Sequence, residues 1–312
     1  MGEEKEDAIL PTELVGASSC HGLDDNEGKI NQDCACVAHP LDADEDAAAF
    51  IVLDGHGKKG HIVSAQALYA LHDALDACMW WGDDATIEEQ FVDAFAQAED
   101  RLMHFDCDAK GTPAAQQSGA VGVVVLLRKG VLWVAHAGDS RAVLGRQDTL
   151  GDIVAEALTE DHVPDMPSER ARIEATGAWV RPEQPEPDFA PCRFYHSRAQ
   201  PWKGPGLSMS RSLGDLDALP AGLIATPTVS TRQLQPEDKF IILASDGLWE
   251  FLPNDDVVSI VSMFFRRGKP AIDATKFLIA KAALAWRTEE GSYRDDITVI
   301  VVYLKDLPMA SA

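Results

Sequence analysis

The sequence predicts an α+β fold: a four-layer α-β-β-α sandwich, in which two antiparallel sheets pack face to face and helix pairs cover the outside. Short apolar runs that end in glycine or aspartate recur along the chain, as expected of strands. Two pairs of segments with helical spacing of apolar residues lie between these runs. The 312 residues are 46% hydrophobic, which is enough for a sizeable core.

The first half of the chain contains most of the predicted strands. Residues 1–30 are polar, and we expect this segment to be frayed or only partly ordered. Strands are predicted over 34–40 and 47–55, and helical spacing predicts helices over 60–79 and 87–105. The stretch 120–140 predicts a hairpin that reverses at Lys129-Gly130, and 141–146 predicts a further strand.

The second half continues in the same style, so we expect one domain over 31–306 and a tail over 307–312. A short helix is predicted to stop at Gly177. The proline-rich stretch 181–191 is predicted to be a surface loop. It is not an interdomain linker, because strands resume at 239–247 and 295–304. Helices are predicted around 255–265 and 271–286.

Composition excludes several classes of partner. With 27 basic and 51 acidic residues the formal charge is −24, which disfavours nucleic acids and anionic membranes. The longest apolar runs, such as 121–127, are far shorter than a membrane span, so we expect no membrane insertion. Cysteines show no paired CxxC spacing, and the acidic N-terminus lacks an apolar signal region. We expect an intracellular monomer, located in the cytoplasm, the nucleus or both.

Aspartates recur at the ends of the predicted strands. Asp54 and Asp246 each follow an apolar run and precede glycine, Asp139 follows a third run, and Asp295 precedes a fourth. An Asp-Gly pair after a strand is commonly a turn, and that interpretation applies to Asp54 taken alone. Because neighbouring strands can bring their ends together, the recurrence instead predicts a cluster of carboxylates. Such a cluster repels itself unless a cation neutralises it.

Oxygen ligands of this kind favour Mg²⁺ or Mn²⁺ over zinc, for which no His or Cys spacing is present. The carbonyl of Gly55 is a further accessible oxygen. Two ions about 3.5–4 Å apart can clamp the attacking and leaving oxygens of a phosphoryl displacement. His56 is close enough in sequence to donate a proton to the leaving alkoxide, although a structural turn histidine is the plainer interpretation of that residue alone.

Together these stretches resemble the type-2C metal-dependent serine/threonine protein phosphatases. The resemblance runs in order from residue 31 to residue 304, and the stretches that carry it are NQD (31–33), FIVLDGHG (50–57), SGAVGVVVL (118–126), VAHAGDSRAVL (134–144), LTEDHVP with RIEATG (158–177), LSMSRSLGD (207–215), ILASDGLWEFLPNDDVV (242–258) and RDDITVIVVYL (294–304).

The resemblance implies hydrolysis of phosphoserine and phosphothreonine in phosphoprotein substrates, with two Mg²⁺ or Mn²⁺ ions and a weaker third. A metal-activated water would attack phosphorus directly, with His56 as the general acid. Asp54 matches the bridging metal ligand and Gly55 a carbonyl ligand. The other matched metal-site positions are Asp246 and Asp295, Asp33 acting through water, and Asp139 at the third ion. A variable flap is implied near 180–206, where Arg193, Arg198 and Trp202 are candidate contacts.

The chain departs from the family pattern beside the site. Family members with an arginine for substrate phosphate carry it five residues before Asp33, where this chain has Gly28. Lys29 is the candidate substitute, although an ammonium lacks arginine's bidentate geometry. Asp296 stands where the family usually has asparagine. Asp215, in the SRSLGD stretch, is a candidate supporting residue or a brace for its loop.

Three alternatives remain to be tested. Cys192 and Arg198 satisfy the C-x₅-R spacing of cysteine phosphatases, but the intervening residues lack the glycine that a phosphate loop needs. A catalytically silent scaffold of the same family is the main rival, and it is disfavoured because the metal-site aspartates and His56 are present. A two-metal nuclease is disfavoured by the acidic charge.

Overall fold

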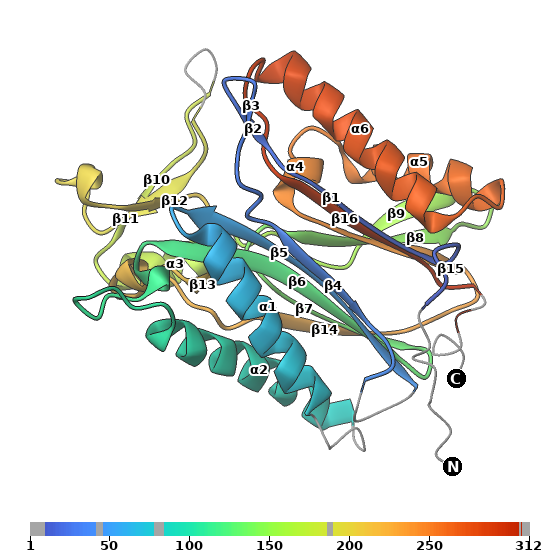
Figure 1. The fold of residues 1–312 in the computed structure, drawn as a ribbon, viewed down its shortest axis with the longest axis horizontal. Coiled ribbons are helices and arrows are strands. Elements are labelled where there is room, and N and C mark those ends of the chain that lie inside the picture. The colour runs from blue at the N-terminus through green and yellow to red at the C-terminus, as the bar shows by residue number, and fades with distance from the viewer. Residues whose placement is uncertain (1–9, 42–45, 78–83, 186–189, 306, 308–312) are drawn as a thin grey trace.

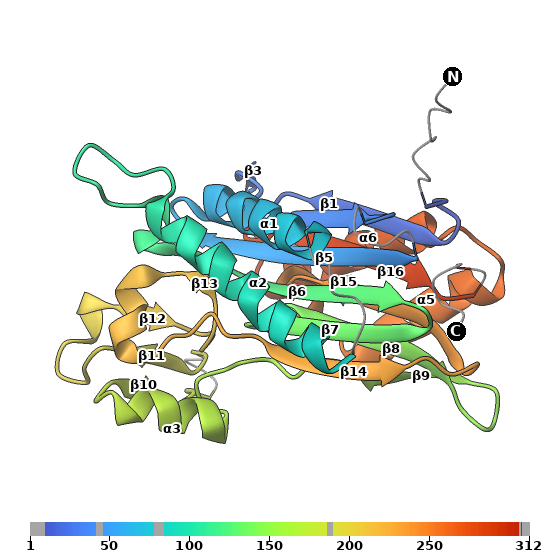
Figure 2. The same ribbon diagram turned by 90° about the horizontal axis from the view of Figure 1, so that it is seen from below.

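The computed structural model describes residues 10–41, 46–77, 84–185, 190–305 and 307. Two antiparallel sheets form the centre of the molecule, and helices cover both outer faces (Figures 1 and 2). The α+β sandwich predicted from the sequence is therefore confirmed. The helices are α1 (Gly60–Asp76), α2 (Asp84–His104), α3 (Pro167–Ala175), α4 (Asp246–Trp249), α5 (Asn254–Arg266) and α6 (Ala271–Glu289).

Each sheet draws strands from distant parts of the sequence. The first sheet has the order β1-β16-β15-β8-β9, with β1 (Val15–Cys20), β8 (Arg141–Gln147), β9 (Ile153–Ala157), β15 (Asp238–Ala244) and β16 (Ile297–Tyr303). The second has the order β14-β7-β6-β5-β4, with β13 beside β6; its strands are β4 (Cys34–Ala38), β5 (Ala47–Gly57), β6 (Ser118–Arg128), β7 (Val131–Ala137), β13 (Leu213–Gly214) and β14 (Thr228–Gln233).

Strand β5 shows how both faces of a sheet come to be buried. Its alternate residues point to opposite faces, as the two-residue period of a strand requires. Phe50 and Val52 pack between the sheets against Ile241 and Ile300, while Ile51 and Leu53 pack under α1 and α2. Every residue from Ala47 to Leu53 is buried, which explains why this run is continuously apolar rather than alternating.

The outer helices complete the layers. Apolar side chains of α1 and α2, including Leu71 and Phe95, form one core with the second sheet. Val261 of α5 and Leu278 of α6 form another core with the outer face of the first sheet, which presents Phe240 and Ile242. In the part of the chain that the structure describes, no helix combines the length and apolarity needed to cross a bilayer.

The N-terminal expectation needs correction, because residues 15–20 belong to the first sheet. Strand β1 pairs antiparallel with β16 from Val15 to Cys20. A short hairpin follows, with β2 (Leu23–Asp24) and β3 (Glu27–Gly28) joined by Asp25 and Asn26 at positive φ. The strand could not be predicted from the polar sequence VGASSC, because pairing with β16 stabilises it rather than an apolar pattern of its own.

The segment predicted as a variable flap forms a small separate sheet of β10 (Trp179–Arg181), β11 (Arg193–Tyr195) and β12 (Pro205–Leu207), beside α3. The loop predicted over 181–191 is the connection between β10 and β11, with a bridge between Gln184 and Ala190; residues 186–189 lie outside the described part. Val180 and Phe194 are buried with Ile173 in the flap's own core.

We expect Phe50→Ala to lower the free energy of unfolding by about 3–5 kcal/mol, because it removes a fully buried ring between the sheets. Leu150→Ala is the matched control, since Leu150 is 85% exposed and should change stability by less than about 0.5 kcal/mol. Urea unfolding followed by circular dichroism measures both, and similar losses in the two variants would contradict the assigned core.

Candidate active site

One cavity of about 910 Å³ collects most of the residues predicted for the site. Asp54, His56, Asp139, Asp246 and Asp295 all line it. They come from β5, from the turn after β7, from the start of α4 and from the residues before β16. The lining also includes residues of the β10–β12 flap, such as Arg193 and Pro205. In Figure 1 this flap lies beside one end of the two sheets.

Asp54 is a strand residue and not a turn residue. Strand β5 remains paired with β6 through Gly57, and Asp54 lies opposite Val121. The glycine after it is required by space, since a Cβ atom at Gly55 would lie 2.5 Å from the carbonyl oxygen of Gly60 and 2.6 Å from that of Gln32. The Asp-Gly sequence therefore lets the strand continue past the close approach of two other backbone segments.

Burial and mutual repulsion dominate the electrostatics of the acids. Burial raises the pKa of Asp54 well above its usual value, and repulsion by Asp246 adds to the effect. The pKa of Asp246 is raised in the same way, by burial and then by the charge of Asp139. Burial, with repulsion from Asp161, raises the pKa of Asp139 to about 6. The fold thus holds several partly buried carboxyl groups around one cavity, where their charged forms are disfavoured.

Asp33 lies behind the cavity and does not line it. It is buried, and its Oδ2 accepts a hydrogen bond of 2.8 Å from Ser245 Oγ, the residue before Asp246. Burial raises the pKa of Asp33 to about 7. This placement connects Asp33 to the backbone that carries Asp246, which is compatible with support of the site from its rear.

His56 forms a close pair with Asp215. The distance from His56 Nε2 to Asp215 Oδ2 is 2.6 Å, and Ser212 Oγ donates to the same carboxylate oxygen at 2.7 Å. Gly119 leaves room for this pair, since a Cβ atom there would lie 2.1 Å from Asp215 Oδ2. Burial alone would lower the pKa of His56, but the Asp215 carboxylate raises it overall.

Lys29, the candidate phosphate ligand, lines the cavity but is already paired. Its Nζ donates to Asp295 Oδ1 at 2.5 Å and lies 3.8 Å from Asp296 Oδ2. Asp296 is buried, where it accepts backbone N–H bonds from Gly22 and Gln32. Asp296 therefore links the segments before β2 and β4 through these hydrogen bonds. The positive charge of Lys29 partly neutralises the carboxylates of Asp295 and Asp296.

The donor set has the chemistry that a hard divalent cation requires, because its members are carboxylates and a backbone carbonyl. Buried oxygens of Asp33, Asp139 and Asp246 (Oδ1 in each) have no hydrogen-bond partner within the described residues, so they retain unused acceptor capacity. As the side chains stand, no three His, Cys, Asp or Glu groups of the described chain converge tightly enough to hold an ion. Asp295 is directed to Lys29 instead.

Several residues near the cavity were missed or left open by the sequence. The sequence left two roles open for Asp215, a supporting residue of the site or a brace for its loop. In the structure Asp215 contacts His56, which lies 159 residues away in the sequence. Arg193, His196 and Lys203 of the flap line the cavity. The sequence carried no signal for His196 or Lys203.

Contacts define the roles of other residues in this region. Arg141 braces its turn, because its guanidinium donates to both oxygens of Asp161 at 3.1 and 2.7 Å. Trp249 is buried in the core. Cys192 belongs to the buried core of the flap and Arg198 lies over the Trp179 ring, so this pair forms no phosphate loop. Trp202 is 74% exposed.

Comparisons with known proteins agree with this geometry. The family model "Protein phosphatase 2C" matches residues 19–291. The chain is 32% identical to "Probable protein phosphatase 2C 34" of Arabidopsis thaliana over 89% of this chain and 78% of that protein. It is 33% identical to "Probable protein phosphatase 2C 72" of the same plant, over 89% and 82%.

A solved structure has the same fold at lower identity. The serine-threonine phosphatase 2C from Toxoplasma gondii superposes with a TM-score of 0.72 at 23% identity, over 93% of this chain and 94% of that chain. The family match includes Asp54, Asp139 and Asp246 of the acidic cavity, whereas Asp295 lies four residues beyond its end. The chain therefore belongs to the protein phosphatase 2C family and is a protein phosphatase.

Proposed function

We propose that this protein is a metal-dependent phosphatase that hydrolyses phosphoserine and phosphothreonine in proteins. The observation that carries the proposal is the gathering of Asp54, Asp139, Asp246 and Asp295 around one cavity at the ends of strands from both sheets. A substrate phosphate brings further negative charge to these acids. Bound cations would offset this charge and let the cavity receive the phosphate.

Asp54, Asp246 and Asp295 would hold two Mg²⁺ or Mn²⁺ ions, with the Gly55 carbonyl as a further ligand, and Asp139 would serve a weaker third. When bound, such ions activate water for direct attack on phosphorus and offset the charge of the phosphoryl oxygens. Asp33 would support the metal site through a bound water, because it accepts a hydrogen bond from Ser245 and its other carboxylate oxygen has no partner in the described chain. The unpaired oxygens of Asp139 and Asp246 support the same assignment.

His56 would donate the proton that the leaving seryl or threonyl oxygen needs. Its Nε2 faces Asp215, and its buried Nδ1 has no partner among the described residues. When the ring is protonated, one N–H serves Asp215 and the other remains to be donated. Asp215 favours that protonated form, which is the form a general acid requires.

Lys29 remains the proposed phosphate ligand, together with the flap residues that face it across the cavity. The ammonium forms an ion pair with Asp295 at 2.5 Å. Cations bound to Asp295 would weaken that ion pair and leave the ammonium available to a phosphate oxygen. Arg193, His196 and Lys203 supply further positive or polar groups on the flap side, where a peptide backbone would lie.

We expect Asp246→Asn to reduce phosphate release from a phosphothreonine peptide by more than about a hundredfold in millimolar Mn²⁺, because it removes a ligand charge without changing the side-chain size. Asp93→Asn, on the exposed face of α2, is the control and should retain wild-type turnover. EDTA should abolish turnover of both the wild type and the control.

Circular dichroism should show that Asp246→Asn remains folded, because the substitution relieves repulsion in the metal-free state. Full activity of Asp246→Asn would remove the site assignment. A folded wild-type protein without Mn²⁺-dependent turnover would instead favour the scaffold reading.

We expect His56→Ala to slow hydrolysis of a phosphoserine peptide by about 10²–10⁴-fold, in the range for loss of a general acid. Hydrolysis of p-nitrophenyl phosphate should fall far less, because its leaving group needs little protonation. Steady-state rates on the two substrates at saturating Mn²⁺ measure the difference, and equal losses would contradict the acid role.

A further inference from the structure

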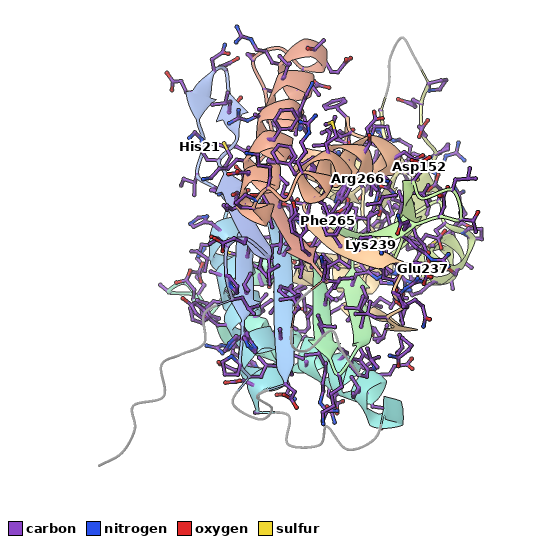
Figure 3. All side chains as sticks on the ribbon, turned by 90° about the vertical axis from the view of Figure 1, so that its right-hand side faces the viewer. His21, Asp152, Glu237, Lys239, Phe265 and Arg266 are labelled. Atoms are coloured by element: carbon purple, nitrogen blue, oxygen red, sulfur yellow. The ribbon has the colours of Figure 1, made fainter. Side chains whose placement is uncertain are left out.

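A second cavity, of about 920 Å³, lies at the opposite ends of the two strands that lead to the acids. It is bounded by the start of β15, the end of β16 and the α5–α6 connection, whereas Asp246 and Asp295 lie after β15 and before β16. Because β15 has seven residues, the two cavities are separated by roughly 23 Å at about 3.3 Å per residue. Lys239, Phe265 and Arg266 mark this face in Figure 3.

The charge of this cavity is opposite to that of the molecule. Its basic lining residues are Lys239, Arg266, Lys269 and Lys305, in a chain with a formal charge of −24. Lys269 and Lys305 have no ion pair or side-chain hydrogen bond with the described residues. Lys239 donates to the carbonyl of Pro236. Arg266 donates to the carbonyl of Gly151 and lies 3.9 Å from the carboxylate of Asp152.

Acidic residues in the lining do not cancel this charge. Asp238 is already bound by Arg232, whose guanidinium donates to both of its carboxylate oxygens at 3.0 and 2.8 Å. Glu13 is the other carboxylate of the lining. The remaining excess of ammonium groups favours an anionic occupant.

The walls between these charges are apolar, with one unused polar group. Leu14, Leu234, Phe265 and Leu304 contribute apolar surface. Tyr303 also lines the cavity, is only 5% exposed, and its hydroxyl has no partner within the described chain. A buried hydroxyl without a partner is costly in a folded protein, so a ligand oxygen at this position would stabilise it.

We propose that this cavity binds a small organic anion with an apolar body, such as a carboxylate on an aliphatic chain or a sulfonate on aromatic rings. Lys269 and Lys305 would pair with the anionic head, Tyr303 would donate a hydrogen bond, and the leucines and Phe265 would enclose the apolar part. The volume is that of a small-molecule site, which spans about 300–1,000 Å³. The site is independent of the proposed catalysis, because no residue lines both cavities.

The test uses 1-anilinonaphthalene-8-sulfonate as a fluorescent probe and decanoate as a competitor, with the full chain. One saturable probe site per chain is expected, and decanoate should displace the probe while the neutral detergent octyl glucoside should not. Millimolar inorganic phosphate with Mn²⁺ should leave the signal unchanged, because both would go to the acidic cavity. Displacement by phosphate and Mn²⁺ would place the probe in the catalytic cavity and overturn the proposal.

Variants distinguish the pocket from general surface charge. The double variant K269E/K305E should weaken probe binding by at least about tenfold, since it replaces two charge-assisted contacts by repulsion. The control K110E/K276E changes the net charge equally at exposed positions outside the lining and should bind as the wild type does. Tyr303→Phe should weaken binding by about fivefold, the value of one hydrogen bond.

Absence of saturable binding to the wild type overturns the proposal. Equal affinity in K269E/K305E and K110E/K276E does so as well. Thermal unfolding of each variant confirms that the comparison is made between folded proteins, and Tyr303→Phe keeps the test decisive should the charge reversal disturb the α5–α6 connection.

Discussion

Repulsion among partly buried carboxylates at one end of the sandwich is the constraint around which this molecule is organised. Asp54, Asp139 and Asp246 are partly buried with raised pKa values, and one oxygen each of Asp139 and Asp246 lacks a hydrogen-bond partner in the described chain. The apolar layers provide the stability that offsets this cost, because nearly all residues of the central strands β5, β6, β7, β15 and β16 are buried. A bound cation would turn the same arrangement from repulsive to attractive.

The two-sheet architecture explains why the acids meet. Asp54 extends from β5 of one sheet, while Asp246 and Asp295 flank β15 and β16 of the other. Packing the sheets face to face through Phe50 and Ile241 brings those strand ends to a common edge. The same packing leaves the far ends of β15 and β16 around a second cavity of opposite charge, so one pair of strands connects two chemically different sites.

Much of this could be predicted from the sequence, because the strongest elements are specified locally. Strand β5, helices α5 and α6 and the Lys129-Gly130 turn, with both residues at positive φ, follow from apolar period and turn chemistry. Strands β1, β9 and β14 were not predicted, because pairing with neighbours stabilises these more polar segments. The metal-site roles came from motif resemblance, and they remain predictions that the cavity supports.

The sequence could not predict which side chains contact one another, because the partners are far apart along the chain. The His56–Asp215 pair and the Lys29–Asp295 pair join positions 159 and 266 residues apart, and nothing local marks either partner. Asp296 illustrates the same point, since its departure from the family pattern suggested added charge beside the site. In the structure its carboxylate accepts backbone N–H groups of two other segments.

The most direct test of the account is the number of protons released when Mn²⁺ binds to the metal-free protein. Isothermal titration calorimetry in buffers of different ionisation enthalpy, at pH 6 and pH 8, measures it. With pKa values of about 7 for Asp33 and about 6 for Asp139, Asp33 is mostly protonated and Asp139 about half protonated at pH 6, and both are largely ionised at pH 8. We predict binding with clear proton release at pH 6 and less at pH 8. Absence of binding, or binding with no proton release at either pH, would contradict a carboxylate cluster that awaits a cation.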